Sequence, residues 1–260
     1  MIKNIIILII IVGVAVLIYM KKDTGEMKNV EMLSKDGIAT VEEDVTYFTN
    51  TQGFYVYPEK EGEYPGVVMI HEWWGLNDQI KDMAKELAKE GYRVLAVDLF
   101  GKVATTPDEA RTQTAELDQV KALENLKAAV SFLRQAGALK VASLGWCFGG
   151  KQSVELAISG AKLDATVVYY GSGLATATDK LKPIKWPVLG IFGDQDQSIP
   201  VETVHSFESS LNTLGVKNEI YIYPGVGHAF ANPSGVNHAP NETKDAWAKV
   251  LIFLEENLKN

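Results

Sequence analysis

The chain has 260 residues, a formal net charge of −8 and a 47% apolar fraction, which is enough for one large domain with a buried core. Its acidic balance and its lack of long Lys/Arg clusters argue against nucleic acid as a partner. A single cysteine, Cys147, excludes an intramolecular disulfide and a zinc site built on several cysteines.

A continuous apolar run covers residues 5–20, with Lys3 before it and Lys21 and Lys22 after it. A helix of this length reaches about 24 Å against roughly 30 Å of bilayer hydrocarbon, and flanking lysines that snorkel make up the difference. We expect residues 1–22 to be a membrane anchor that holds the rest of the chain outside the cytoplasm. A cleaved signal peptide is the alternative.

Residues 23–40 lack periodicity and are expected to be a tether, so the folded domain would cover 41–260. Two short runs rich in β-branched and aromatic residues, 45–48 and 54–57, predict an opening hairpin. Further buried strands are expected at 66–71, 93–98, 139–144, 165–170, 188–192 and 219–223. Helical spacing predicts helices at 78–90, 106–135 with an interruption, 151–158, 200–214 and 242–258. This alternation predicts a single α/β domain, in which helices cover both faces of a mostly parallel sheet.

A glycine-rich stretch, Gly145-Trp-Cys-Phe-Gly-Gly150, joins one expected strand directly to the following helix. Gly145 and Gly149 give a sharp turn the room it needs on either side of Cys147. The helix N-terminus favours a thiolate, and the Phe148 amide is free to donate to an oxyanion. This pattern is typical of the nucleophile elbow of α/β-hydrolases, with Cys in place of Ser. Taken alone, such a cysteine is often only a small core residue.

Two other strand ends supply a candidate acid and a candidate base. Asp194 and Asp196 follow one strand, and we favour Asp196 as the carboxylate that orients a histidine, although either residue is also suited to capping the loop. His228 lies in a glycine-flanked loop after the last strand and is the best placed histidine to accept a proton. The competing histidines are His71, His205 and His238. The order Cys147, Asp196, His228 is that of an α/β-hydrolase triad.

The segment from His71 to Gly75 follows an earlier strand, where this fold supplies its second oxyanion donor, here the backbone N–H of Trp73. Glu72 beside it is either a base for the thiol or an exposed loop residue, and the residues alone favour neither. The segment is not a zinc motif, because no second histidine follows four residues after His71.

Over roughly residues 45–257 the chain resembles the dienelactone hydrolase family of α/β-hydrolases. The resemblance implies a triad of Cys147, Asp196 and His228, with the Trp73 and Phe148 amides holding the oxyanion. It also implies that Glu72 pairs with a neutral thiol at rest, is displaced by substrate and then takes the proton, before water releases the acid. The matching segments are His71-Glu-Trp-Trp-Gly75, Val97-Asp-Leu-Phe100, Gly145-Trp-Cys-Phe-Gly-Gly150, Tyr169-Tyr-Gly171, Gly193 to Pro200 and Gly227-His-Ala-Phe230.

The chain departs from the family where enzymes acting on dienelactone grip its carboxylate with two arginines. Lys102 and Asn232 stand at those positions, and Lys does not replace a bidentate Arg. We therefore expect a substrate other than dienelactone, bound in an aromatic pocket to which Trp73 and Trp74 contribute, unless one of these is core.

The resulting hypothesis is a hydrolase of small-molecule carboxylic esters or lactones that works without a metal or an organic cofactor. A thioesterase is a related alternative, because the same triad would serve a thioester. A non-catalytic ligand-binding module on a hydrolase scaffold is the alternative from another class.

Overall fold

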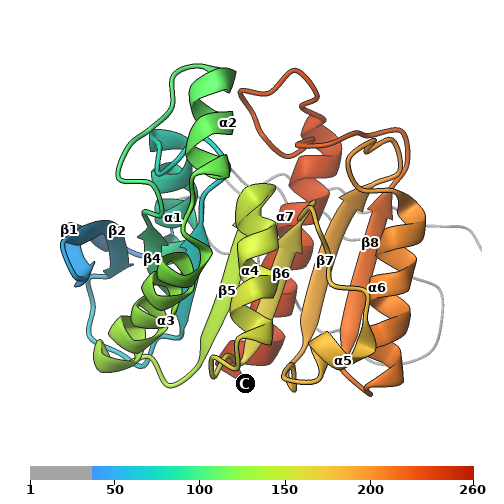
Figure 1. Ribbon diagram of the computed structural model, residues 1–260. Helices are drawn as coiled ribbons and strands as arrows, with labels where there is room; N and C mark the ends of the chain where they lie inside the picture. Colours follow the sequence, from blue (N-terminus) through green and yellow to red (C-terminus); the bar gives the residue numbers. More distant parts are fainter. Residues whose placement is uncertain (1–36) are drawn as a thin grey trace, which may run out of the picture. The chain divides into compact units, whose positions relative to one another are not determined.

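An eight-stranded sheet organises the computed structural model, which describes residues 37–260 (Figure 1). The strands are β1 Thr40–Phe48, β2 Thr51–Pro58, β3 Gly66–Ile70, β4 Arg93–Val97, β5 Val141–Trp146, β6 Ala165–Tyr169, β7 Val188–Gly193 and β8 Asn218–Tyr223. Their order is β1-β2-β4-β3-β5-β6-β7-β8. The β1–β2 and β2–β4 pairs are antiparallel, and every other pair is parallel. Every residue of β3, β5, β6 and β7 is buried, which explains why these strands are apolar in the sequence except for Ser143 and Thr166.

Helices cover both faces of this sheet, as the sequence predicted. In Figure 1, α3 and α4 lie in front of the strands, and α1 and α7 lie behind them. The helices are α1 Asp78–Lys89, α2 Pro107–Ala115, α3 Gln119–Gln135, α4 Phe148–Ile158, α5 Thr178–Leu181, α6 Val201–Thr213 and α7 Pro240–Leu254, continued by a π-helical turn at Glu255–Lys259. The expected interruption within 106–135 separates α2 from α3. The single turn α5 was not expected.

The two helices around that interruption begin at side-chain caps. Thr106 and Glu109 form a capping box at the start of α2, and Asp118 accepts hydrogen bonds from the backbone at the start of α3. Each cap satisfies backbone N–H groups that a helix start leaves without internal partners. The caps fix the α2–α3 corner, which borders the cleft described below.

The expected anchor over residues 1–22 and most of the expected tether lie outside the described residues. Within 37–260, no helix is both long and apolar enough to cross a bilayer. Ile38 already donates to the carbonyl of Lys89, and Glu59 donates to the carbonyl of Ala39. The chain is thus hydrogen-bonded to the domain just before β1 begins.

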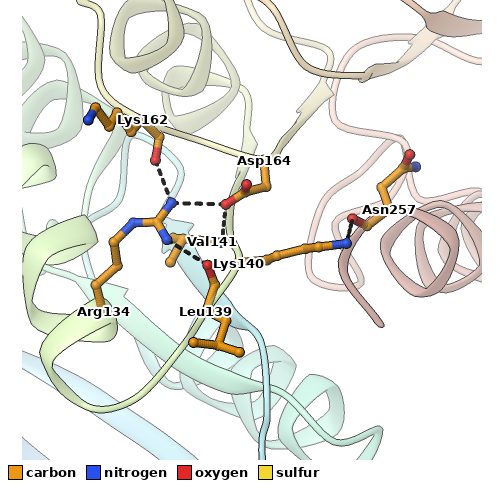
Figure 2. A network of polar contacts seen from close by, with 7 residues as sticks. All are labelled: Arg134, Leu139, Lys140, Val141, Lys162, Asp164 and Asn257. Atoms are coloured by element: carbon orange, nitrogen blue, oxygen red, sulfur yellow. Dashed lines mark hydrogen bonds and ion pairs between the residues drawn. The ribbon is translucent and has the colours of Figure 1, made fainter. Parts of the chain in front are cut away.

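A polar network closes the amino ends of the central strands (Figure 2). Arg134, in the last turn of α3, donates to the carbonyl oxygens of Leu139 at 2.7 Å and Lys162 at 2.9 Å. It also pairs with Asp164 at 2.9 Å. The same carboxylate oxygen of Asp164 accepts from the backbone of Val141 at 2.8 Å. The network therefore joins α3, the start of β5 and the segment that leads into β6.

The opposite edge of the sheet, at the carboxyl ends of the parallel strands, brings the candidate reactive residues together. The chain passes outward from β3 to β4 and returns to β5 on the other side of β3. Loops diverge at such a reversal and leave room for a ligand. Glu72 follows β3 and Cys147 follows β5, so both residues flank this reversal.

Candidate active site

Cys147 lies on a sharp, strained turn between β5 and α4. Its backbone has φ 54° and ψ −113°, a conformation that a side-chain-bearing residue adopts only at a cost. A Cβ on Gly145 would collide with the carbonyl of Gly149, and a Cβ on Gly149 would collide with the carbonyl of Ile70. Both glycines are therefore required for the turn, for the reason that the sequence suggested.

The cysteine, the histidine and one aspartate form a continuous chain of polar contacts. Cys147 Sγ lies 3.1 Å from His228 Nε2, and His228 Nδ1 lies 2.7 Å from Asp196 Oδ2. The Asp196 side chain is fully buried. Its second oxygen accepts from the backbone of Ser198 at 2.8 Å and of Ile199 at 3.2 Å. These contacts fix the carboxylate and, through it, the orientation of the imidazole.

The other candidate aspartate, Asp194, has a different role. Its carboxylate accepts from the backbone of Gly225 at 2.7 Å and from the side chain of Gln195 at 3.0 Å. It therefore ties the loop after β7 to the loop that carries His228. Of the two aspartates, Asp196 is the one in contact with the histidine.

The surroundings of His228 favour its protonated form. Burial alone would lower its pKa, but the hydrogen bonds to Asp196 and Cys147 outweigh burial and raise the pKa to about 10. The imidazolium then donates from Nδ1 to Asp196 and from Nε2 to the sulfur. A positive partner in contact with the sulfur stabilises a thiolate.

His71 is fully buried and has a structural part in the site. Its Nε2 accepts from the backbone of Leu99 at 3.2 Å, so its Nδ1 carries the proton and donates to the carbonyl of Glu72 at 2.6 Å. Burial lowers the pKa of His71, although the backbone contact with Glu72 opposes this. A neutral His71 therefore fixes the loop that carries Glu72. Of the remaining histidines, His205 is exposed on α6 and His238 is half-buried in the loop before α7.

Glu72 is buried beside the triad and hydrogen-bonds to Asn232. Its Oε2 accepts from the Asn232 amide at 2.5 Å, and its Oε1 has no partner within residues 37–260. Burial raises the pKa of this carboxyl to about 7, while Asn232 and the charge of His228 work in the opposite direction. The sulfur is in contact with His228, whereas the scheme implied by the resemblance pairs a resting thiol with this glutamate. Glu72 is thus buried and hydrogen-bonds to Asn232, while Cys147 hydrogen-bonds to His228.

The two backbone amides expected to hold an oxyanion are those of Phe148 and Trp73. The N–H of Phe148 is the first of α4 and, like any first helical N–H, has no partner inside the helix. The N–H of Trp73 makes no backbone hydrogen bond in the described part of the chain. The carbonyl of Trp73 accepts from the buried Gln113 side chain at 2.6 Å. Gln113 therefore orients this peptide, a role that the sequence analysis did not foresee.

A cleft of about 380 Å³ opens beside the sulfur. It is lined by Trp73, Thr114, Leu117, Gln119, Cys147, Phe148, Lys151, Gln152 and Ser172. The α2–α3 corner and the first turn of α4 supply most of this lining. The sequence analysis had selected Trp73, Cys147 and Phe148 among these residues and missed the others. The only available signal for Lys151 was its position four residues after Cys147, on the helix that follows the turn.

The three residues expected to bind substrate lie outside the lining of that cleft. Trp74 packs edge to face against Trp73, with ring centroids 5.1 Å apart. Lys102 is exposed and lines a larger neighbouring groove of about 880 Å³. Asn232 is buried and bonded to Glu72. The structure therefore brings the candidate triad together but does not gather Lys102, Trp74 and Asn232 around the cleft.

The fold and this constellation define a class of protein. A mostly parallel sheet with a nucleophile elbow after β5, an aspartate after β7 and a histidine after β8 is the arrangement of an α/β-hydrolase. The sequence profile described as "Dienelactone hydrolase family" matches residues 51–258. The chain belongs to the dienelactone hydrolase family.

Individual relatives agree with this assignment. Protein Usf of Aquifex pyrophilus is 33% identical over 221 residues, which are 80% of this chain and 94% of that protein. A Synechocystis protein named "Putative carboxymethylenebutenolidase" is 30% identical over 230 residues, covering 80% of this chain and 92% of that protein. The family makes this chain a hydrolase with a small-molecule substrate, so the alternative of a non-catalytic binding module is not retained.

Solved structures show the same architecture. The crystal structure of the dienelactone hydrolase-like promiscuous phosphotriesterase P91, from metagenomic libraries, superposes with a TM-score of 0.74 at 27% identity, over 85% of this chain and 99% of that one. A protein of Klebsiella pneumoniae, titled a "Putative Dienelactone Hydrolase", gives 0.77 at 24% identity, over 84% and 99% of the two chains. The second likeness concerns the fold alone.

Proposed function

We propose that this hydrolase cleaves carboxylic esters or lactones through a covalent acyl-cysteine on Cys147. The observation that carries the proposal is the unbroken chain from Sγ through His228 to the buried carboxylate of Asp196, with contacts of 3.1 and 2.7 Å. A cysteine nucleophile needs a nearby base or cation, and the base needs a third group that fixes its orientation. Each of these needs is met by a named group.

The reaction proceeds in two halves. The Cys147 thiolate attacks the ester carbonyl carbon, and the amides of Trp73 and Phe148 hold the oxygen that becomes negative. When the tetrahedral intermediate collapses, the bond to the alkoxide breaks and His228 gives its Nε2 proton to that leaving group. Neutral His228 then takes a proton from water, whose oxygen attacks the acyl carbon, and the acid departs as the thiolate is restored.

Glu72 acts before these two halves: when Cys147 is a neutral thiol, Glu72 takes its proton, and the thiolate that attacks is formed. The pKa of about 7 leaves Glu72 able to hold or release a proton at neutral pH, which a carboxyl with an ordinary pKa cannot do. Only its Oε2 is engaged by Asn232, so its Oε1 is available to a proton. We expect the acid side of the pH profile of kcat/KM to follow this group.

The proposal is tested by intact-protein mass spectrometry of the full chain after incubation with activated esters, a lactone and a thioester. We expect a mass increase equal to the acyl group, mapped to Cys147 by peptide analysis and absent in Cys147→Ala. We also expect Cys147→Ala to lose turnover by at least about 10³-fold, since it removes the nucleophile itself. Equal turnover by the two proteins would refute cysteine catalysis, even if an adduct formed.

A further inference from the structure

Lys151 is a charged residue in the lining of the cleft that contains the sulfur. It lies four residues after Cys147 in the first turn of α4 and lines the same cleft as Cys147. Its side chain is half-buried, and its stem passes the backbone of Gly173, where an added Cβ would lie 3.8 Å from the lysine Cδ and Cε. No carboxylate of residues 37–260 lies within ion-pairing distance of its ammonium.

This position does not favour a lysine on structural grounds. The first turn of a helix carries the positive end of the helix dipole, which disfavours a cation there by about 0.3–1 kcal/mol. The first turns of α1 and α2 hold acidic residues, as this rule predicts, whereas the first turn of α4 holds none. Lys151 therefore gains nothing from its helix and has no acidic partner in the described part of the chain.

Apart from Cys147, the other side chains that line the cleft carry no charge. Gln119 and Gln152 bind each other through two amide hydrogen bonds of 2.8 and 2.9 Å, so much of their bonding capacity is used internally. Trp73, Leu117 and Phe148 supply apolar surface. A Cys147 thiolate is paired with the His228 imidazolium, so Lys151 carries the one charge among the residues that line this cleft with no opposite charge beside it. It lies on a protein whose net charge is −8.

We propose that Lys151 is a specificity-determining residue that binds a carboxylate carried by the ester substrate, at a distance from the bond being cleaved. This inference rests on the proposed function. A single ammonium neutralises a monoanion, whereas a dianionic phosphate would keep an unpaired charge against the apolar surface of the cleft. The substrate class is accordingly an ester or lactone that bears one free carboxylate.

Two other positions do not serve this purpose. Lys102 lies in the larger groove, whose lining also includes Asp98, Glu116 and Asp118, so acidic neighbours offset its attraction for an anion. Asn232 is uncharged, and its amide is occupied by Glu72. Of these three positions, Lys151 on α4 is therefore the one suited to bind an anion.

The test compares two activated esters of equal acyl length, p-nitrophenyl hemiglutarate with a free carboxylate and p-nitrophenyl valerate without one. The quantity measured is the ratio of kcat/KM for the anionic ester to kcat/KM for the neutral ester, using the full chain. We expect Lys151→Gln to lower this ratio at least tenfold, about 1.4 kcal/mol, mainly through KM for the hemiglutarate. We expect Lys151→Glu to lower it further, and added salt to lower it in the unaltered protein.

Lys127→Gln is the matched control, because it removes one positive charge from an exposed site on α3. A ratio that is unchanged in Lys151→Gln, or that falls as much in Lys127→Gln or Lys102→Gln, overturns the inference. Failure of the proposed function has a different signature, because the unaltered protein would then hydrolyse neither ester and form no adduct on Cys147. Hydrolysis of the valerate with a ratio independent of Lys151 refutes this inference alone.

Discussion

The two polar networks at opposite edges of the sheet differ in how completely their groups are paired. At the amino ends, Arg134 donates to three oxygens, and one oxygen of Asp164 accepts twice (Figure 2). At the carboxyl ends, Glu72 keeps one buried oxygen without a partner within residues 37–260, and Cys147 has a positive φ. Both networks tie neighbouring strands together, and the second contains Glu72, whose buried carboxyl has a pKa raised to about 7.

The distribution of backbone strain matches this difference. Four residues other than glycine have a positive φ in the described structure, and three of them, Cys147, Tyr170 and Ala229, lie at the carboxyl edge. Tyr170 is fully buried and packs edge to face against the ring of His228, and Ala229 follows His228 directly. Strained, incompletely paired groups persist only when the surrounding fold imposes them.

Among variants that test this difference between the two networks, Glu72→Gln is expected to change the free energy of unfolding most. The folded pKa of Glu72 is raised from 4.5 to about 7, so folding favours its neutral form. The associated stability is fully present below pH 4.5 and is lost as the pH rises through 7. Because glutamine acquires no charge, the variant should be more stable than the unaltered protein by about 3 kcal/mol at pH 8. Urea unfolding at pH 5 and pH 8 measures this difference.

The same variant should acylate more slowly, by about tenfold or more, because it removes a proton acceptor. Stopped-flow measurement of p-nitrophenol release reports this step. A gain in stability together with a loss of rate would show that the carboxyl edge gives up stability for reactivity. If unfolding depends on pH equally in the two proteins, the pKa of Glu72 is not raised by folding. An unchanged acylation rate would leave Glu72 without a catalytic role.

Arg134→Met, at the amino ends of the strands, is expected to have a smaller effect. It should lower the stability of the protein and leave its activity almost unchanged. The change keeps the aliphatic stem but removes three hydrogen bonds, two of them to backbone carbonyls. Since Arg134 and Asp164 are about one-third exposed, water replaces part of the loss, and we expect a destabilisation of about 1–2 kcal/mol. kcat/KM should stay within about twofold, because the network lies at the edge opposite the sulfur.

Arg111→Met is the control for that measurement. Arg111 pairs with Asp108 on the exposed side of α2, where both side chains are largely solvated, so we expect a change below about 0.5 kcal/mol. Similar losses from the two arginine variants would mean that the amino-edge network adds no more than an ordinary surface pair. A large loss of activity in Arg134→Met would show that the network at the amino ends of the strands affects catalysis at their carboxyl ends.

The sequence predicts the fold well because the fold follows from periodicity. Fully buried parallel strands such as β3 and β7 are continuous apolar runs, and a helix start such as Thr106 to Glu109 carries its own capping signal. The four-residue α5 has neither signal, because one turn of helix is too short to show a period. The elbow was equally predictable, since only glycine fits at positions 145 and 149.

The surroundings of the reactive residues were less predictable, because they depend on contacts between distant segments. The Asn232 amide reaches Glu72 across 160 positions of the chain, and no local pattern reports such a contact. Gln113 reaches the Trp73 carbonyl from α2 in the same way. The resemblance directed attention to Lys102 and Asn232 by position, whereas the cleft itself is lined by Lys151, which a motif match does not select.

The smallest expected effect concerns the hydrogen bond from Asn232. Its amide lowers the pKa of Glu72, so Asn232→Ala should move this pKa upward from about 7, by less than about one unit. If the reaction needs the Glu72 carboxylate, the acid side of the pH profile of kcat/KM moves to higher pH by the same amount. The variant is then slower near pH 6.5 and approaches the unaltered protein as the pH rises. Ser234→Ala, which removes a hydroxyl that donates to Asn232, should move the profile less, and a profile that does not move in Asn232→Ala would separate the ionisation of Glu72 from catalysis.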